Sequence, residues 1–256
     1  LRLSGRVTDR FRKSYGHQQE DLAYHALVRC PCQIFFIPFL FFRNFTRFRF
    51  FLKYSNGQSK DSIRVNKYRV VLVSSSLGLY FGASFYYVQN SWWSDISNDF
   101  RFDPGNDLVY ALNVDKAAHF FGGLYASDLF SSSYRWAGFS NKKSLWYGAF
   151  FGSGIQLAIE MKDAYAPYWG FSMWDFGTGS VGSFWPIFQQ YYPPAQAIDF
   201  KFSYFKRSNI YWELEAERGR TPNQFSWYDD YPNQTYWMTI DVNRLNEDLK
   251  FPDYID

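Results

Sequence analysis

The chain has little of what marks a disulfide-linked or zinc-ribbon protein. It contains two cysteines and three histidines among 256 residues. Both cysteines lie in Cys30-Pro31-Cys32, and no ligand set at metal-binding spacing surrounds them. We therefore expect neither a disulfide framework nor a structural zinc site, and we interpret the pair as incidental.

Motifs of several common enzyme classes are absent as well. The chain has no Walker phosphate-binding loop and no Gly-x-Ser-x-Gly nucleophile elbow. It also lacks His-x-x-x-His and Glu-x-x-His, the spacings at which two side chains of one helix face bind the same metal ion. These absences argue against a P-loop NTPase, an α/β-hydrolase and a helical metalloenzyme of the usual kind. No catalytic residue is assigned from the sequence.

The net charge of +3 averages two unlike parts of the chain. Residues 1–60 carry 11 Lys/Arg against 3 Asp/Glu, whereas residues 61–256 carry 16 against 21. The larger part is mildly acidic, which argues against a nucleic-acid partner. We expect residues 1–60 to be a basic targeting segment or a non-native leader. Arginines follow its apolar run Gln33–Phe42, where a signal-peptidase site would need small residues. The residues Leu27-Val28-Arg29 before Cys30 are not small either, so the sequence predicts neither a signal-peptidase site nor a lipid-attachment site.

Charge is missing altogether between Val70 and Ser94. This run of 25 residues is long enough to cross a bilayer as a helix. Lys67 and Arg69 precede it, and Trp92 and Trp93 stand where an interfacial aromatic belt would lie. The run predicts a membrane-embedded helix, with a buried helix of a soluble bundle as the alternative.

Aromatic residues are abundant, at 23% of the chain. Such a surplus suits a protein that meets a membrane interface, because Tyr and Trp present one apolar and one polar edge. An aromatic-rich soluble core is the alternative.

Three further helices follow the uncharged run. One is expected from about Asn113 to Phe130, and a second is expected to be capped by Ser144 and to stop before Pro167. The third is expected to start at the N-cap Ser172, with Pro193-Pro194 beyond its end. Each has a stripe of small residues that allows close packing: Gly122, Gly123 and Ala126; Gly148 and Gly152; Gly179, Gly182 and Ser183.

The last 60 or so residues have a different pattern. Apolar and polar residues alternate over 198–204, 210–216 and 236–242, which predicts three antiparallel strands. The predicted fold class is therefore mainly α: an antiparallel four-helix, membrane-associated bundle at 61–195, with a short antiparallel β extension at 196–256.

Polar residues are concentrated at one end of each predicted helix. In an up-down-up-down bundle the starts of the second and fourth helices and the end of the third helix lie at the same end. We therefore expect a polar rim, which comprises Asp115, Lys116, His119, Gln156, Glu160, Asp163, Ser172 and Asp175.

Two interpretations of this rim stay open. It is a structural network, with Lys116 paired to Asp163 or Asp175, because ionisable groups at the edge of an apolar bundle need partners. Alternatively, His119, Glu160 and Asp175 bind a divalent metal or a lipid headgroup, and His119 or Glu160 acts as a general base on a bound water. Ser172 is explained equally well as a simple helix cap.

Three motifs carry a resemblance to known families: Asp115-Lys116-x-x-His119-Phe120, Glu160-x-Lys162-Asp163 and Gly170-Phe171-Ser172-x-x-Asp175. Over about Leu108 to Pro194 the chain resembles the YfiM-like family of uncharacterised, predicted periplasmic lipoproteins, and more distantly the VanZ-like membrane proteins. It departs from both patterns at Gly179, where an Asn is expected. The resemblance implies an envelope location and a helical fold, and it implies no particular chemistry.

We therefore expect a bacterial cell-envelope protein with its polar rim facing the periplasm. The favoured function is non-enzymatic, with a rim that stabilises the bundle and engages a partner, either membrane lipid or another envelope protein. A metal- or headgroup-binding protein, or a metal-assisted hydrolase, is the alternative.

Overall fold

The computed structural model describes residues 64–93, 99–103, 105–108, 110–166, 169–211, 213 and 230–245. Its long helices are α3 (Lys67–Trp92), α4 (Val114–Trp136), α5 (Asn141–Asp163) and α6 (Met173–Tyr191). Two strands, β1 (Ile198–Tyr204) and β2 (Gln234–Ile240), form an antiparallel sheet. Short helical turns connect them: η2 (Asn106–Leu108), η3 (Tyr110–Asn113), η4 (Pro193–Ala197), η5 (Tyr231–Asn233) and α8 (Val242–Leu245). The described chain is mainly helical with a small antiparallel sheet, as predicted, while the basic segment 1–60 lies outside the described residues.

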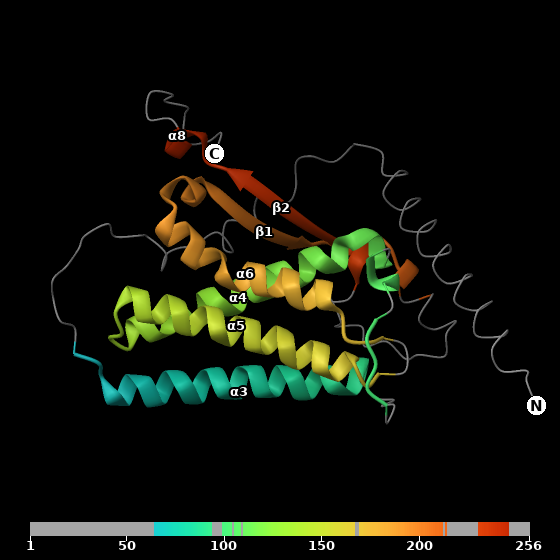
Figure 1. The fold of residues 1–256 in the computed structure, drawn as a ribbon, viewed down its shortest axis with the longest axis horizontal. Helices are drawn as coiled ribbons and strands as arrows, with labels where there is room; N and C mark the ends of the chain where they lie inside the picture. The colour runs from blue at the N-terminus through green and yellow to red at the C-terminus, as the bar shows by residue number, and fades with distance from the viewer. Residues whose placement is uncertain are drawn as a thin grey trace, which may run out of the picture.

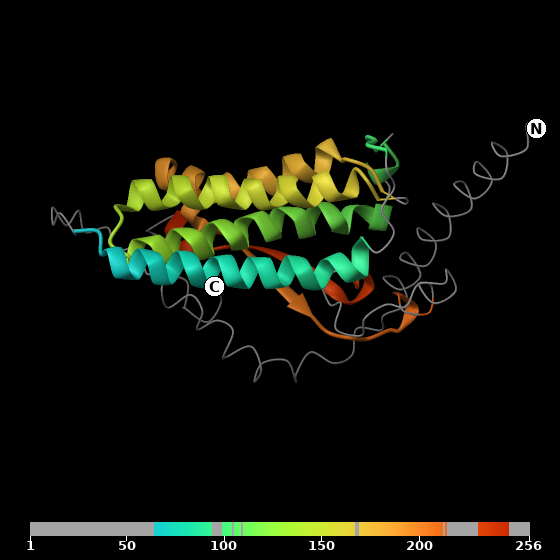
Figure 2. The same cartoon turned by 90° about the horizontal axis from the view of Figure 1, so that it is seen from below.

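Figure 1 shows the long helices side by side, with α3 along one side of the molecule and the sheet along the other. In the view from below, α4 lies between α3 and the pair α5 and α6 (Figure 2). Helix α4 packs extensively against both α5 and α6, whereas α3 touches the others far less. The described bundle is thus a tight three-helix unit with a fourth helix laid against it.

Glycines bring α4, α5 and α6 into backbone contact, which confirms the predicted small-residue faces. A Cβ at Gly182 of α6 would collide with the carbonyl oxygen of Phe120 in α4, and one at Gly123 would collide with that of Gly179. A Cβ at Gly152 of α5 would lie 2.7 Å from Ser183 Oγ. Helix backbones approach this closely where a residue at the crossing has no side chain.

Helix α3 begins at Asn66, whose side chain accepts hydrogen bonds from the backbone amides of Tyr68 and Arg69. The buried face of α3 is narrow. Val73 and Leu77 are buried against Phe130 and Ala137 at the far end of α4. Between Lys67 and Gln89 the helix is long and apolar enough, by length and composition, to cross a membrane.

The N-terminus of α5 differs from the prediction. The cap is Ser140, which accepts a hydrogen bond from the amide of Lys143, and the helix begins at Asn141. Ser144, the predicted cap, lies inside the helix and is buried. Ser140 and Ser144 are equally suitable as N-cap residues by type. Gly138, with φ of +98°, ends the preceding turn, so that Ser140 is the residue in the N-cap position.

Two of the three predicted strands form. β1 pairs with β2 in register Phe200↔Met238 and Phe202↔Tyr236. One face of the sheet covers α4, with the Phe120 and Phe200 rings 4.6 Å apart. The strand predicted at 210–216 is wrong at its start, because Ile210, Tyr211 and Glu213 are helical. Its period-two alternation was too short to exclude a helical turn.

We predict that Gly182→Ala destabilises the bundle by about 1–3 kcal/mol or more, because the new methyl group meets backbone that cannot move aside. Gly177→Ala in the same helix is the matched control, since nothing lies within 4 Å of its Cβ position. That control should be neutral or stabilise by up to about 1 kcal/mol. Chemical unfolding in detergent measures both, and equal effects would contradict the close packing.

Candidate functional site

The residues of the predicted polar rim lie at the ends of three helices, and these ends are close together. Helices α4 and α6 begin, and α5 ends, at the same end of the bundle (Figure 1). The structure places Asp115, Lys116 and His119 in the first turns of α4, and Gln156 and Glu160 in the last turns of α5. Ser172 and Asp175 lie at the start of α6. Most of these side chains are buried, and Glu160 is only 1% exposed.

Lys116 is at the centre of the cluster. Its Nζ lies 2.5 Å from Asp107 Oδ1, 2.7 Å from Asp175 Oδ1 and 3.2 Å from Asp115 Oδ2. The contact with Asp175 is an ion pair at hydrogen-bonding distance whose angles are poor. Three carboxylates around one ammonium group compensate its burial and strongly raise its pKa, although burial alone would lower it.

Asp107 is a member of the cluster that the sequence analysis missed. It lies in η2, before α4, and the Asp103 side chain holds this turn by accepting hydrogen bonds from the amides of Gly105 and Asp107. The available signal was the segment Asp103-Pro104-Gly105-Asn106, whose composition is typical of a turn. After this turn, the next acidic residue is Asp107, which contacts Lys116 at the start of α4.

Ser172 is both a helix cap and a bridge. Its Oγ accepts a hydrogen bond from the amide of Asp175 and donates one to Asp107. Its own amide donates to Glu160 Oε2 at 2.9 Å. Ser172 therefore connects the start of α6 to the end of α5 and to η2, so the capping interpretation and the network interpretation are both satisfied.

His119 is held between α4 and α5. Its Nδ1 lies 2.9 Å from Gln156 Oε1, so the ring donates from Nδ1 to the amide oxygen as the side chains are oriented. Nε2 lies 3.7 Å from Asp115 Oδ1, and Nδ1 lies 3.7 Å from Glu160 Oε1. Burial alone would lower the pKa of His119, but the carboxylates of Asp115, Asp175 and Glu160 outweigh it and raise the pKa to about 9.

Gln156 also explains the departure at Gly179. A Cβ at residue 179 would lie 2.5 Å from Gln156 Cγ and 2.7 Å from its amide oxygen. The Gln156 side chain thus fills the space that a larger residue at 179 would need. The polar group at this place is the Gln156 amide of α5, instead of a side chain at residue 179 of α6.

Acids outnumber bases in the described part of this cluster. Its acidic members are Asp107, Asp115, Glu160, Asp163 and Asp175, and its basic members are Lys116 and His119. Burial raises the pKa of Glu160 to about 8, of Asp175 to about 7 and of Asp163 to about 6. Asp115 is also buried, but the neighbouring charges of His119 and Lys116 lower its pKa. Protons on Glu160 and Asp175 therefore reduce the excess of negative charge near neutral pH.

Asp163 lies apart from Lys116. Its Oδ1 accepts a hydrogen bond of 2.7 Å from Trp93 Nε1 at the end of α3. Of the two partners predicted for Lys116, Asp175 contacts it and Asp163 does not among the described contacts. The interfacial position predicted for Trp93 is wrong, because the ring is 2% exposed and is held by this buried acid.

A second missed residue is Tyr231, in η5 of the C-terminal extension. Its hydroxyl donates to Asp115 Oδ1 at 2.5 Å, and its ring packs on Tyr110. The contact joins residues 116 positions apart. No local pattern in the sequence indicates it.

Among the described residues, one set of side-chain atoms could bind a divalent metal ion. One atom each from Asp115, His119 and Asp175 lies within 4.8 Å of the others. However, the Lys116 ammonium already contacts both carboxylates of that set. Glu160 Oε1 is buried and has no hydrogen-bond partner among the described residues. Of the predicted metal ligands, His119 and Asp175 belong to the geometric set, and Glu160 lies beside it.

We predict that Lys116→Met destabilises the folded chain by about 3–5 kcal/mol at pH 7, because it leaves buried carboxylates without their cation. The loss should be smaller at pH 5, where Asp175 and Glu160 are protonated in the fold. Lys143→Met, at an exposed lysine, is the matched control and should have little effect. Unfolding midpoints at the two pH values measure this, and equal losses at both would contradict the assignment.

A second prediction concerns pH. His119, Glu160, Asp163 and Asp175 all have folded-state pKa values above their usual ones. Each contributes stability that is present below its usual pKa and is lost as pH rises through its folded-state pKa, so stability should fall from about pH 5 to about pH 9.

The test compares this slope in Glu160→Gln, which keeps an acceptor for the Ser172 amide but binds no proton. We expect a shallower fall with pH than in the wild type. Glu213→Gln, at an exposed acid, should keep the wild-type slope. The prediction fails if both variants fall in parallel with the wild type.

The comparisons with known proteins cover the part of the chain that carries the cluster. Residues 105–189 match a family model, DUF2279, described as a predicted periplasmic lipoprotein. The match ends before the sheet and Tyr231. No curated protein and no solved structure matches the chain. Over η2, α4, α5 and α6 the chain is therefore similar to a family of predicted periplasmic lipoproteins of unknown function, which supports a cell-envelope protein without distinguishing the YfiM-like or VanZ-like families.

Proposed function

We propose that this chain is a non-enzymatic membrane-associated protein of the bacterial cell envelope. Its polar cluster joins the helix ends, the preceding turn and the C-terminal extension into one unit. The resulting rigid end of the bundle then faces the periplasm and engages a partner there.

The observation that carries the proposal is the position of the Lys116 ammonium. It lies among the carboxylates of Asp107, Asp115 and Asp175, where an external cation would otherwise bind. Two grooves of the described surface lie elsewhere, between α3 and α4 and between α4 and the sheet. A buried cluster with its own cation suits a structural network better than an active site.

Membrane association is supported by α3. The helix is apolar and largely exposed, with Val71 65% and Leu79 75% exposed. Its first turn and the α4–α5 turn are basic, whereas the cluster end is acidic. By the positive-inside rule the basic end would face the cytoplasm and the cluster end the periplasm, if α3 spans the inner membrane.

The family similarity supports the envelope location, because the matched family is described as a predicted periplasmic lipoprotein. The motifs around Asp115, Glu160 and Ser172 support the finer resemblance to YfiM-like and, more distantly, VanZ-like proteins. That resemblance is part of the proposal.

A metal-binding function is the second candidate. It is favoured by Glu160 Oε1, a buried carboxylate oxygen to which no described residue donates a hydrogen bond, beside the set of Asp115, His119 and Asp175. A divalent ion would displace Lys116 and balance the excess of acids. A water on that ion would give a metal-assisted hydrolase with Glu160 or His119 as base.

Metal analysis of the detergent-purified full chain separates the two. Under the proposal, divalent metals stay well below one per chain in the wild type, even after incubation with Zn²⁺ or Mn²⁺ and desalting. His119→Ala and Glu160→Ala should then lower the unfolding midpoint without changing metal content.

Asp163→Asn is the matched control, an acid of the same rim outside the geometric metal set. One metal per chain in the wild type and in this control, lost in His119→Ala and Glu160→Ala, would overturn the structural proposal in favour of the second candidate.

A further inference from the structure

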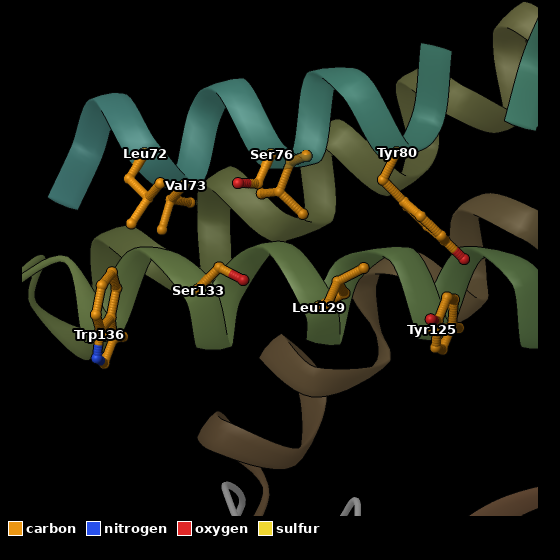
Figure 3. A pocket seen from close by; sticks show the side chains of 9 residues that line it. Leu72, Val73, Ser76, Tyr80, Tyr125, Leu129, Ser133 and Trp136 are labelled. Atoms are coloured by element: carbon orange, nitrogen blue, oxygen red, sulfur yellow. The ribbon is translucent and has the colours of Figure 1, made fainter. Parts of the chain in front are cut away.

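Helix α3 leaves a groove where it passes α4. Its upper wall comes from Leu72, Val73, Ser76 and Tyr80, and its lower wall from Tyr125, Leu129, Ser133 and Trp136 (Figure 3). The groove is open on one side and has a volume of about 440 Å³. This lies within the range of roughly 300–1,000 Å³ that ligand pockets occupy.

The groove exists because few residues join the two helices. Val73 and Leu77 are the buried residues of α3 that face α4, and the small side chains Ser76 and Ser133 lie between the larger ones. The walls are mainly apolar, and their polar side-chain groups are the uncharged hydroxyls of Ser76, Tyr80, Tyr125 and Ser133 and the indole N–H of Trp136. Such a lining suits a hydrocarbon chain that lies parallel to the helices.

One end of the groove is basic. The Arg69 guanidinium lies 4.8 Å from the centre of the Trp136 ring and donates to the Trp136 carbonyl oxygen at 3.2 Å. The described residues 64–69 and 135–143 carry six basic residues and no acidic one. They are Arg64, Lys67, Arg69, Arg135, Lys142 and Lys143.

The length of α3 places this basic end at a membrane surface. The 23 residues Lys67–Gln89 would extend about 34 Å at 1.5 Å per residue. The hydrocarbon core of a bilayer is about 30 Å thick. A helix that spans it from Lys67 puts Arg69 at the headgroup level and the groove at the level of the acyl chains.

We propose that the α3–α4 groove binds one acyl chain of an anionic phospholipid, with the headgroup phosphate at Arg69. This rests on the membrane association in the proposed function and adds a site and a headgroup charge to it. The apolar groove recognises the chain, and the basic end selects an anionic headgroup over a zwitterionic one.

The test uses full-length protein in phosphatidylcholine nanodiscs that contain phosphatidylglycerol with a photoreactive group in its acyl chain. Crosslinked positions are mapped by mass spectrometry. We expect them at 72–80 and 125–136, on residues that line the groove. Ser76→Phe fills the groove and should reduce this labelling about tenfold, which corresponds to 1.4 kcal/mol.

Ser75→Phe is the matched control, because Ser75 is exposed on the same helix and does not line the groove. It should label like the wild type. Arg69→Gln should remove the preference for phosphatidylglycerol over a phosphatidylcholine probe, whereas Lys142→Gln should keep it.

Equal labelling of Ser75→Phe and Ser76→Phe, labelling centred on outward positions such as Tyr86, or crosslinking of two chains through the groove would overturn the inference. Flotation with vesicles tests the underlying proposal separately. A chain that floats but leaves the groove unlabelled contradicts only the lipid site, whereas a chain that does not float contradicts the membrane association itself.

Discussion

The Lys116 ammonium and the three carboxylates that lie within 3.2 Å of it form the interaction on which the rest of the structure depends. Asp115 belongs to α4, Asp175 to α6 and Asp107 to the turn before α4. Through Ser172 the same network reaches Glu160 on α5, and through Asp115 it reaches Tyr231 in the C-terminal extension. Separating any of these elements would leave a buried charge without its partner, which costs several kcal/mol.

Close backbone packing makes this network possible. Gly123, Gly179 and Gly182 allow α4 and α6 to touch, which keeps the N-terminal ends of the two helices close enough for Lys116 and Asp175 to make contact. Bound protons then reduce the negative charge of the carboxyl groups, as the raised pKa values of Glu160 and Asp175 indicate. Helix α3 contributes little to this unit. Its apolar surface is instead largely exposed, which is the observation behind the proposed membrane association.

Much of this arrangement could be predicted from the sequence, because helix ends and small-residue stripes are local patterns. The uncharged run from Val70, the cap at Ser172 and the four-residue spacing from Gly148 to Glu160 together predict which helix ends meet. Other features depend on contacts distant in sequence. Asp107 and Tyr231 lie in turns with no periodicity, and the choice of Ser140 over Ser144 as a cap depends on where the preceding turn ends. From the sequence, Trp93 was predicted to be an interfacial residue, because its hydrogen-bond partner Asp163 lies 70 positions away and no local pattern connects the two.

The central claim is that Lys116 and Asp175 stabilise each other across α4 and α6, and a double-mutant cycle measures this most directly. Unfolding free energies of the wild type, Lys116→Met, Asp175→Asn and the double variant give the coupling between the two side chains. The structure predicts a favourable coupling above about 1 kcal/mol at pH 8, where the Asp175 carboxyl is mostly ionised. Additive losses, with a coupling indistinguishable from zero, would contradict the account.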